Sequence, residues 1–252
     1  MAPDRSIALV TGASGIAAAT ARYLARQGLS VAALDRAPDN LAALGETIPG
    51  LLAIQRDLTE PDAAADAVAQ VLARFGHLDV LVNVVGISGR RFGDGPVHSC
   101  TDEGWGTVMD TNLTTTFRMC RAALAPMMDA GRGSIVNTAS VLGYAPAKLF
   151  ATHAYAASKG AIIALTRTMA AYYADHGIRV NAVAPGLIET PMSLRAQGDE
   201  PTKAYIKHRQ PLTGTFGSAE DVADAIGFLA LDQSRFVTGT VLEVAGGWGV
   251  AG

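Results

Sequence analysis

The sequence has few cysteines, few charged side chains and no histidine pattern of the kind that binds metal. Only Cys100 and Cys120 occur among its 252 residues. They form neither a disulfide framework nor a metal-type spacing. No histidine has another histidine four residues away, as zinc sites on helices require (His77, His98, His153, His176, His208). We therefore expect no metal site.

Charge of one sign and long apolar runs are also lacking. Charged residues make up 17% of the chain and the net charge is −3, which gives no electrostatic footprint for nucleic acid or an anionic membrane. No secretory segment follows Met1, and no apolar run is long enough to cross a bilayer. We expect a cytoplasmic protein whose partner is a small molecule, with neither nucleic acid nor membrane. Hydrophobic residues, at 49%, are sufficient for a large core.

Short apolar runs alternate with helical patterns along the chain. The runs are continuous in hydrophobicity, which indicates strands buried on both faces, and strand–helix alternation indicates a parallel sheet with right-handed crossovers. Because no linker divides residues 1–252, we expect a single α/β domain: a doubly wound parallel sheet (Rossmann fold) of about seven strands with helices on both faces. The expected strands are 6–10, 29–34, 51–55, 78–83, 134–138, 178–184 and 241–244; the expected helices are 15–27, 39–47, 60–75, 101–130, about 155–173 and 218–231. Thr59 is the expected N-cap of the third helix, and residues 187–216, which contain Gly198, Pro201, Pro211 and Gly214, resemble a mobile lid.

Tyr155 and Lys159 are four residues apart within an expected helix, so their side chains share one helical face. A free phenol has a pKa of ~10 and exchanges protons poorly at neutral pH. A nearby ammonium favours the phenolate and lowers that pKa. The pair could exchange a proton with an alcohol or carbonyl oxygen. An ordinary helix with one buried aromatic residue and one solvated lysine has the same spacing.

A glycine-containing turn, Thr11-Gly12-Ala13-Ser14-Gly15-Ile16-Ala17, joins the first strand to the first helix. Glycines there let a pyrophosphate approach the helix N-terminus. Asp35 ends the second strand and can accept hydrogen bonds from both ribose hydroxyls of an adenosine. It would repel a 2′-phosphate by about 4 kcal/mol at ~4 Å and an effective dielectric of ~20. NAD is therefore expected over NADP, although Arg36 could soften the repulsion.

With these motifs the chain resembles the short-chain dehydrogenase/reductase family over nearly its whole length. Within that family it resembles the 3-oxoacyl-thioester reductases and the sugar-alcohol dehydrogenases. The resemblance implies a catalytic group of Asn112, Ser140, Tyr155 and Lys159. It also implies a dinucleotide-binding part at about 1–140 and a catalytic and substrate part at about 140–252. The residues implied in cofactor binding are Gly12, Ser14, Gly15, Ile16, Asp35, Arg36, Asp57, Leu58, Asn83, Gly86, Tyr155, Lys159, Pro185, Gly186, Ile188 and Thr190.

The resemblance assigns a role to each catalytic residue. Tyr155 exchanges the proton while hydride moves to or from nicotinamide, and Lys159 lowers the phenol's pKa and orients the nicotinamide ribose. Ser140 stabilises charge on the reacting oxygen. Asn112, at a break in its helix, holds a water that links Lys159 to solvent.

Three features depart from the family pattern. The phosphate turn is one residue shorter than usual and has Ala17 in place of its last glycine. Asn83-Val84-Val85-Gly86 has valine where the family has a second asparagine and an alanine. Fourteen residues separate Ser140 from Tyr155, whereas the family that the chain resembles usually has about 12 at this place. That loop borders the substrate.

The substrate is much less visible in the sequence. The expected pocket residues are Leu142, Phe150, His153, Leu187 and Met192. Arg90 and Arg91 could reach a carboxylate or phosphate, but arginines in such a loop are usually only solvated. We expect an NAD-dependent secondary-alcohol dehydrogenase. An NADPH-dependent 3-oxoacyl-thioester reductase and a non-catalytic dinucleotide-sensing regulator are the alternatives, and the resemblance implies a homotetramer.

Overall fold

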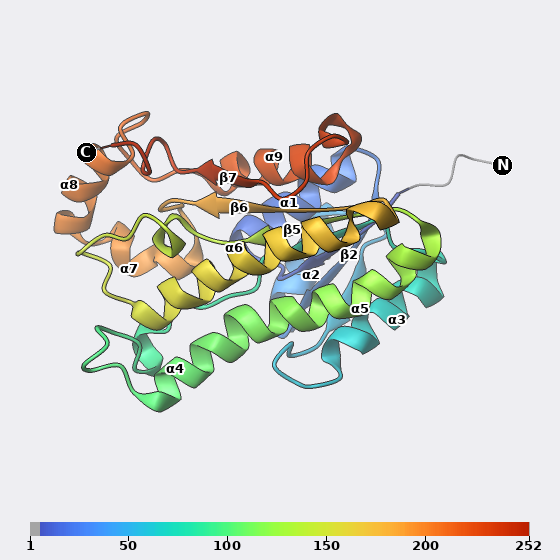
Figure 1. The fold of residues 1–252 in the computed structure, drawn as a ribbon, viewed down its shortest axis with the longest axis horizontal. Helices are drawn as coiled ribbons and strands as arrows, with labels where there is room; N and C mark the ends of the chain where they lie inside the picture. Colours follow the sequence, from blue (N-terminus) through green and yellow to red (C-terminus); the bar gives the residue numbers. More distant parts are fainter. Residues whose placement is uncertain (1–5, 252) are drawn as a thin grey trace.

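The computed structural model describes residues 6–251, and these form a sheet of seven parallel strands between two layers of helices (Figure 1). The strand order is β3-β2-β1-β4-β5-β6-β7, with the crossover between β3 and β4 on which doubly wound folds depend. The strands are β1 (Ile7–Thr11), β2 (Ser30–Asp35), β3 (Leu52–Gln55), β4 (Val80–Asn83), β5 (Gly133–Thr138), β6 (Ile178–Pro185) and β7 (Val241–Val244). Each lies within about two residues of its expected range. The expected Rossmann-type architecture is confirmed.

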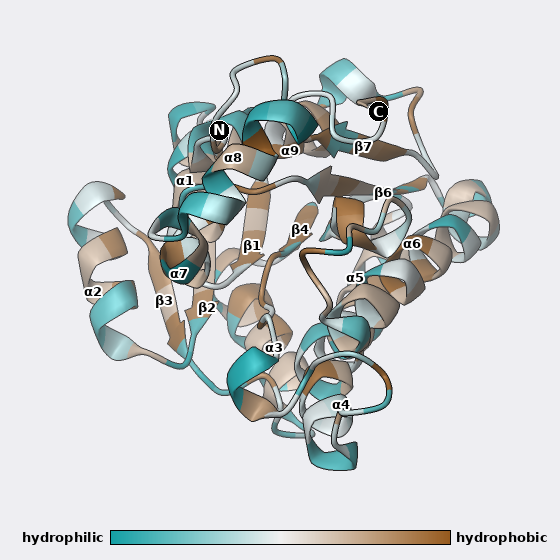
Figure 2. Ribbon diagram, turned by 90° about the vertical axis from the view of Figure 1, so that its left-hand side faces the viewer, coloured by the Kyte–Doolittle hydropathy of each residue, from teal (hydrophilic) through white to brown (hydrophobic). Residues whose placement is uncertain are grey.

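The two helical layers cover opposite faces of the sheet, whose strands are largely brown, that is hydrophobic, in Figure 2. Apolar residues of α1 (Gly15–Arg26), α2 (Pro38–Thr47) and α9 (Ala219–Ala230) pack on one face. Those of α3 (Ala63–Phe75), α5 (Thr115–Ala130) and α6 (His153–Tyr173) pack on the other. Burial on both faces explains why the strands read as uninterrupted apolar runs.

Three details of the helices bear on the expectations. Helix α3 begins at Ala63, and Thr59 does not cap it: its hydroxyl donates to Asp57 Oδ1 at 2.7 Å, which holds residues 57–59 in a turn ahead of the helix. The expected 101–130 helices are α4 (Asp102–Met109) and α5, and the break expected at Asn112 is a π-helical segment over Asp110–Thr114 that continues from one helix to the other. The 187–216 region contains two helices that were not expected, α7 (Leu194–Gln197) and α8 (Glu200–Arg209).

Candidate active site

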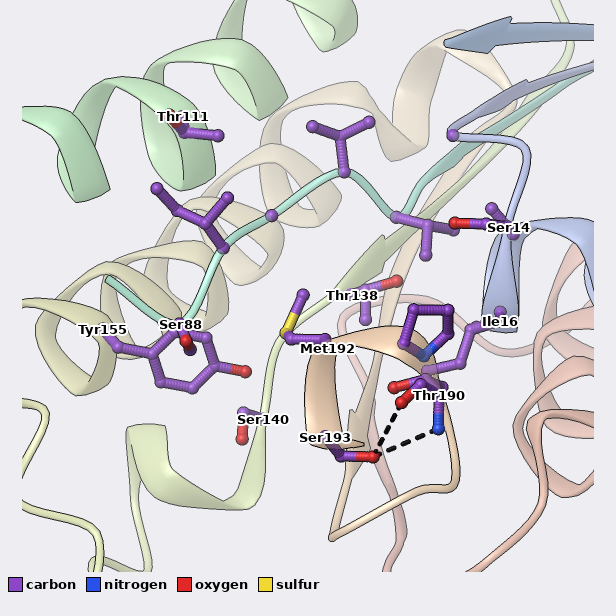
Figure 3. Close-up of a pocket in the computed structure, with 18 of the residues that line it drawn as sticks. Ser14, Ile16, Ser88, Thr111, Thr138, Ser140, Tyr155, Thr190, Met192 and Ser193 are labelled. Carbon is purple, nitrogen blue, oxygen red and sulfur yellow. Dashed lines mark hydrogen bonds between the residues drawn. The ribbon is translucent and has the colours of Figure 1, made fainter. Parts of the chain in front are cut away.

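A cavity of about 720 Å³ opens at the carboxyl ends of the strands, between the β1–α1 turn and the segment that follows β6 (Figure 3). Ligands bind at this edge of open parallel sheets because the strand order reverses there. Most residues expected to bind cofactor or substrate, or to catalyse, line it: Gly12, Ser14, Gly15, Ile16, Asp35, Arg36, Asp57, Leu58, Gly86, Ser140, Leu142, Phe150, Tyr155, Lys159, Pro185, Gly186, Leu187, Ile188, Thr190 and Met192. Asn83, Asn112 and His153 do not line it.

The β1–α1 turn forms the glycine cradle at one end of this cavity. Gly12 has φ +92°, a conformation that favours glycine, and its amide donates to Leu34 O at 2.6 Å. Ser14, the N-cap of α1, makes no side-chain capping bond. The first amides of a helix have no intrahelical acceptors, so this N-terminus offers donors and a positive dipole end to an anion. Despite its shortened sequence, the turn keeps this N-terminus at the cavity, and binding of a dinucleotide pyrophosphate there stays a prediction.

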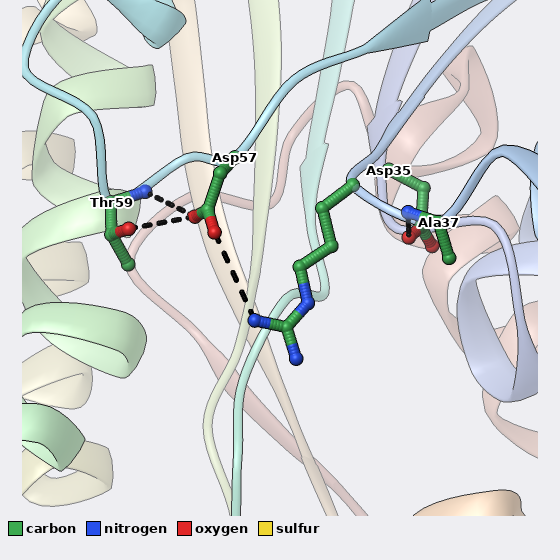
Figure 4. A network of polar contacts seen from close by, with 5 residues as sticks. Asp35, Ala37, Asp57 and Thr59 are labelled. Carbon is green, nitrogen blue, oxygen red and sulfur yellow. Dashed lines mark hydrogen bonds and ion pairs between the residues drawn. The ribbon is translucent and has the colours of Figure 1, made fainter.

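Asp35 and Asp57 fix the neighbouring strand ends (Figure 4). The Asp35 carboxylate accepts from Ala13 N and from Ala37 N, each at 2.8 Å, and so ties the end of β2 to the phosphate turn. Hydrogen bonds from Thr59 hold the pKa of Asp57 below its ordinary value. Arg36 Nη1 lies 3.8 Å from Asp57 Oδ2. The adenosine end of the cavity thus presents paired charges of both signs.

Lys159 and Tyr155 occupy the other end of the cavity. Lys159 is buried, its Nζ donates to Thr138 O at 2.7 Å, and it lies 5.7 Å from the centre of the Tyr155 ring. Burial lowers the pKa of Lys159 to about 8. This amine has no carboxylate hydrogen-bonded to it among residues 6–251, so its charge is held close to the ring uncompensated.

The pKa of Tyr155 differs in direction from the sequence-based expectation. Burial raises it, and a hydrogen bond with Ser140 lowers it by less. In the protein alone, removal of the phenol from water outweighs any effect of the ammonium one helical turn away. Figure 3 shows the phenol directed toward Ser140. The two hydroxyls therefore converge where a reacting oxygen could accept from both.

Asn112 lies behind this group in the π-helical segment, which confirms the expected break in its helix. Its carboxamide accepts from Ile87 N at 2.8 Å and donates to Ile87 O at 3.1 Å and Ser158 Oγ at 3.1 Å. A side chain at Gly86 would place its Cβ 3.1 Å from Asn112 Oδ1 and 3.4 Å from Lys159 Nζ. Asn112 therefore joins the loop after β4 to α6, and its role in holding water stays a prediction.

Two residues expected to touch ligand lie elsewhere. Asn83 is buried beneath the site, and its Nδ2 donates to Asn137 Oδ1 at 2.9 Å and Cys120 Sγ at 3.3 Å, because it ends β4 with its side chain turned into the core. His153 is exposed, and its Nδ1 accepts from Val97 N at 3.0 Å. As the first residue of α6, it points away from the face that carries Tyr155.

Gln210 supports the site, and the sequence does not predict it. It is buried at the end of α8, its Oε1 accepts from Leu187 N at 2.6 Å, and its Nε2 donates to Thr215 O at 2.9 Å. This amide fixes the Pro185–Thr190 backbone that borders the cavity. Gln210 lies 23 positions after its partner Leu187 and belongs to no motif, so no pattern in the sequence predicts this role.

The substrate end is walled by aromatic residues, of which the sequence indicated only Phe150. Its ring lies 5.9 Å from that of Trp248 and 6.1 Å from that of Tyr205. Trp248 is buried, and its Nε1 donates to Ala145 O at 3.0 Å, which holds the C-terminal segment over the loop between Ser140 and Tyr155. The longer loop of this chain thus has its own support.

Asp94 positions the catalytic helix from a distance in sequence. It is buried, its Oδ1 accepts from Ala154 N at 3.0 Å, and its Oδ2 accepts from Tyr155 N at 3.1 Å. Both donors are among the first amides of α6, which lack intrahelical acceptors. The carboxylate thereby anchors the backbone of Tyr155 to the loop after β4.

Within residues 6–251 no group of three or more His, Cys, Asp or Glu side chains could hold a metal ion. Over the same residues no helix has the length and hydropathy needed to span a bilayer.

Several known proteins to which this chain is similar are dehydrogenases or reductases. A family model described as "Enoyl-(Acyl carrier protein) reductase" matches residues 10–249. A cis-4-hydroxycyclohexanecarboxylate dehydrogenase of Sinomonas cyclohexanicum is 40% identical over 246 residues, 96% of each chain. A 3-oxoacyl-(acyl-carrier-protein) reductase of Thermotoga maritima is 38% identical over 97% of this chain and 98% of its own. A solved short-chain type dehydrogenase/reductase of Mycobacterium ulcerans superposes with a TM-score of 0.90, at 31% identity over 98% of this chain and 90% of that one.

Proposed function

The chain belongs to the short-chain dehydrogenase/reductase family, whose members include alcohol dehydrogenases and ketone reductases, and we propose that it interconverts a secondary alcohol and a ketone with NAD(H), using Tyr155 as acid and base. One observation supports this most strongly. Tyr155, Ser140 and Lys159 meet at one end of the cavity whose other end is the glycine cradle and Asp35. This distribution suits a dinucleotide laid across the strand ends with its reactive ring beside the phenol.

In the proposed reaction a bound nicotinamide supplies or accepts the hydride, and the protein handles the proton and the oxygen. Tyr155 Oη gives its proton to the ketone oxygen, or takes it from the alcohol. Ser140 Oγ donates a hydrogen bond to the same oxygen as negative charge develops there. Lys159 keeps a positive charge near the phenolate left behind, and its own position is fixed by the Thr138 carbonyl.

We assign the nucleotide preference to NAD because of Asp35. Its carboxylate lines the cavity at the end of β2, where it would accept hydrogen bonds from ribose hydroxyls and repel a 2′-phosphate. Arg36 is the feature that favours NADP, because its positive charge could attract the 2′-phosphate. Its guanidinium lies beside the Asp57 carboxylate instead. An NADPH-dependent 3-oxoacyl-thioester reductase is therefore the second candidate. Asp35→Asn removes the repulsion of the 2′-phosphate. If the assignment to NAD is right, this variant should therefore have a lower NADPH dissociation constant relative to that of NADH.

The proposal also covers the division of the chain into two parts, its assembly and its location in the cell. We assign dinucleotide binding to a part at about 1–140, and catalysis and substrate binding to a part at about 140–252. A homotetramer is supported by aromatic side chains exposed on the long helices, among them Trp105 and Phe117, each 45% exposed. Light scattering of the purified protein tests the assembly. We propose a cytoplasmic location, which fractionation of the cells that make the protein would test.

A panel of ketones and secondary alcohols, each with NADH or NADPH (NAD or NADP for oxidation), tests the function by absorbance of the reduced cofactor. Because of the relative that acts on a hydroxycyclohexanecarboxylate, cyclic substrates come first, followed by 3-oxoacyl thioesters. Turnover with NADH in preference to NADPH supports the proposal. Turnover of thioesters with NADPH alone supports the second candidate. Cofactor binding without turnover of any compound would support a dinucleotide sensor instead.

A further inference from the structure

The charged residues that line the cavity are divided unevenly between its two ends. At the adenosine end, Asp35 and Asp57 accompany Arg36 and Arg56. At the reactive end, Arg90 and Arg195 join Lys159, and no carboxylate lines the cavity there among the residues that the structure describes. Arg90 and Arg195 therefore give the reactive end positive charge beyond that of Lys159, which the proposed proton transfer does not use.

Arg90 projects from a loop that is tied to the catalytic helix. It begins the 3₁₀ turn Arg90–Phe92, between Gly89 and Asp94, and Asp94 binds the amide of Tyr155. Gly89, with φ +76°, approaches Asp94 so closely that an added Cβ would lie 2.7 Å from the aspartate Cβ. The backbone of Arg90 is thus held in a loop that is tied through Asp94 to the first turn of α6.

Arg195 enters from the opposite wall, on α7. The base of this short helix is fixed by Ser193, whose Oγ donates to Ile188 O at 2.6 Å. Gln197 Nε2 donates to Thr190 O at 3.1 Å. These bonds connect Arg195 to the same Ile188–Thr190 backbone that borders the cavity.

Neither guanidinium takes part in an ion pair within residues 6–251. The pKa of Arg90 is lowered by burial and by the positive charge of Arg195, while Asp94 raises it. Both residues line the same cavity, and Arg195 acts on Arg90 as a like charge. Asp94 and Asp199 are the nearby acids, and their carboxylates already accept the first amides of α6 and α8.

We propose that Arg90 and Arg195 together bind an anionic group of the substrate, so that the enzyme acts on alcohols and ketones that carry a carboxylate. Two guanidinium groups that line one cavity without ion-pair partners among the described residues suit a carboxylate, which accepts charge-assisted hydrogen bonds from each. The bound anion would relieve the repulsion between the cations and link α7 to the loop after β4. The inference rests on the proposed function, since it places this group beside the reacting carbon.

The cofactor pyrophosphate is the other anion that the two arginines could meet. A side chain at Gly15 would lie 3.2 Å from Thr190 Cγ2, so the segment leading to Arg195 also passes close to the phosphate turn. The affinity for NADH distinguishes the two sources, because only a phosphate contact would make it depend on the arginines.

The test compares a carboxylate with its neutral isostere on the protein saturated with NADH. Cyclohexanecarboxylate and cyclohexanecarboxamide have no hydroxyl or ketone to react, and calorimetry gives both dissociation constants; benzoate and benzamide repeat the comparison. We expect the carboxylate to bind about tenfold more tightly. Arg90→Gln and Arg195→Gln should each raise its dissociation constant about tenfold and leave that of the carboxamide unchanged.

Two control variants remove one positive charge each, from the turn that contains Arg90 and from α8, which packs against α7. Arg91, stacked 5.3 Å from the Phe92 ring, and Lys203, paired with Glu200 at 2.7 Å, do not line the cavity. Arg91→Gln and Lys203→Gln should therefore not change the affinity for either probe.

Several results would overturn the inference: equal binding of carboxylate and carboxamide in both pairs, equal losses in the control variants, or weaker NADH binding in the arginine variants. Because these measurements need no turnover, they are separate from the ketone panel. If neutral ketones turn over as well as their carboxylated analogues while the probes show no preference, the proposed function stands and this inference fails.

Discussion

Removal of the Asp94 carboxylate should both destabilise the protein and slow its reaction. The carboxylate is buried and accepts two backbone amides at the start of α6, at 3.0 and 3.1 Å. A hydrogen bond to a charged group contributes about 1.5 to 3 kcal/mol, so two bonds at the lower end of that range give about 3 kcal/mol. Asp94→Ala should lower the free energy of unfolding by this amount, and Asp94→Asn, which keeps one acceptor without the charge, by about half of it.

Urea titration followed by circular dichroism measures the change, with Thr101→Ala as the control. Thr101 Oγ1 accepts a single amide, that of Gly104 at 2.9 Å, at the start of α4, so its loss should cost about 1 kcal/mol. Because one of the Asp94 donors is Tyr155 N, Asp94→Ala should also lower kcat about tenfold without weakening NADH binding. The reasoning is refuted if Asp94→Ala costs no more than Thr101→Ala, or if kcat is unaffected.

The other predictions concern the packing and the charge behind Tyr155. Gly143→Ala should destabilise the protein by about 1 to 3 kcal/mol, because its Cβ would lie 2.8 Å from Gly160 N, whereas Gly45→Ala, in an open part of α2, should be neutral or stabilising in the same urea titration. Lys159 has a pKa of about 8 in the folded protein against ~10.4 unfolded, so between these values the unfolded chain binds more protons and stability should rise with pH. Lys159→Met should remove this rise in the absence of cofactor, and an unchanged slope would show that Lys159 is not its source.

The sheet and the catalytic helix could be predicted from the sequence because local patterns determine them. Doubly buried strands are continuous apolar runs, and Tyr155 and Lys159 lie on one helical face by spacing alone. Glycines in the β1–α1 turn also lie where the sequence indicates, since the turn needs the conformation that Gly12 adopts.

The supports of the site could not be predicted in the same way. Asp94, Gln210 and Trp248 each act through one or two hydrogen bonds to segments 23 to 103 residues away, and no local pattern records such a partner. Helix α8 has little amphipathic character, so its periodicity gives no helical signal. The sequence predicts a lowered pKa for Tyr155, and this prediction is wrong. Burial, which depends on the tertiary structure, raises the pKa by more than the neighbouring charge lowers it.

Comparison of the Tyr155→Phe variant with the unaltered protein tests the central claim most directly. The substitution removes the transferable proton of the phenol and little volume. On a ketone that the protein reduces, kcat should fall by about 10² or more, while the dissociation constant of NADH stays unchanged. A variant that keeps most of its turnover would contradict the assignment of Tyr155 as the acid and base.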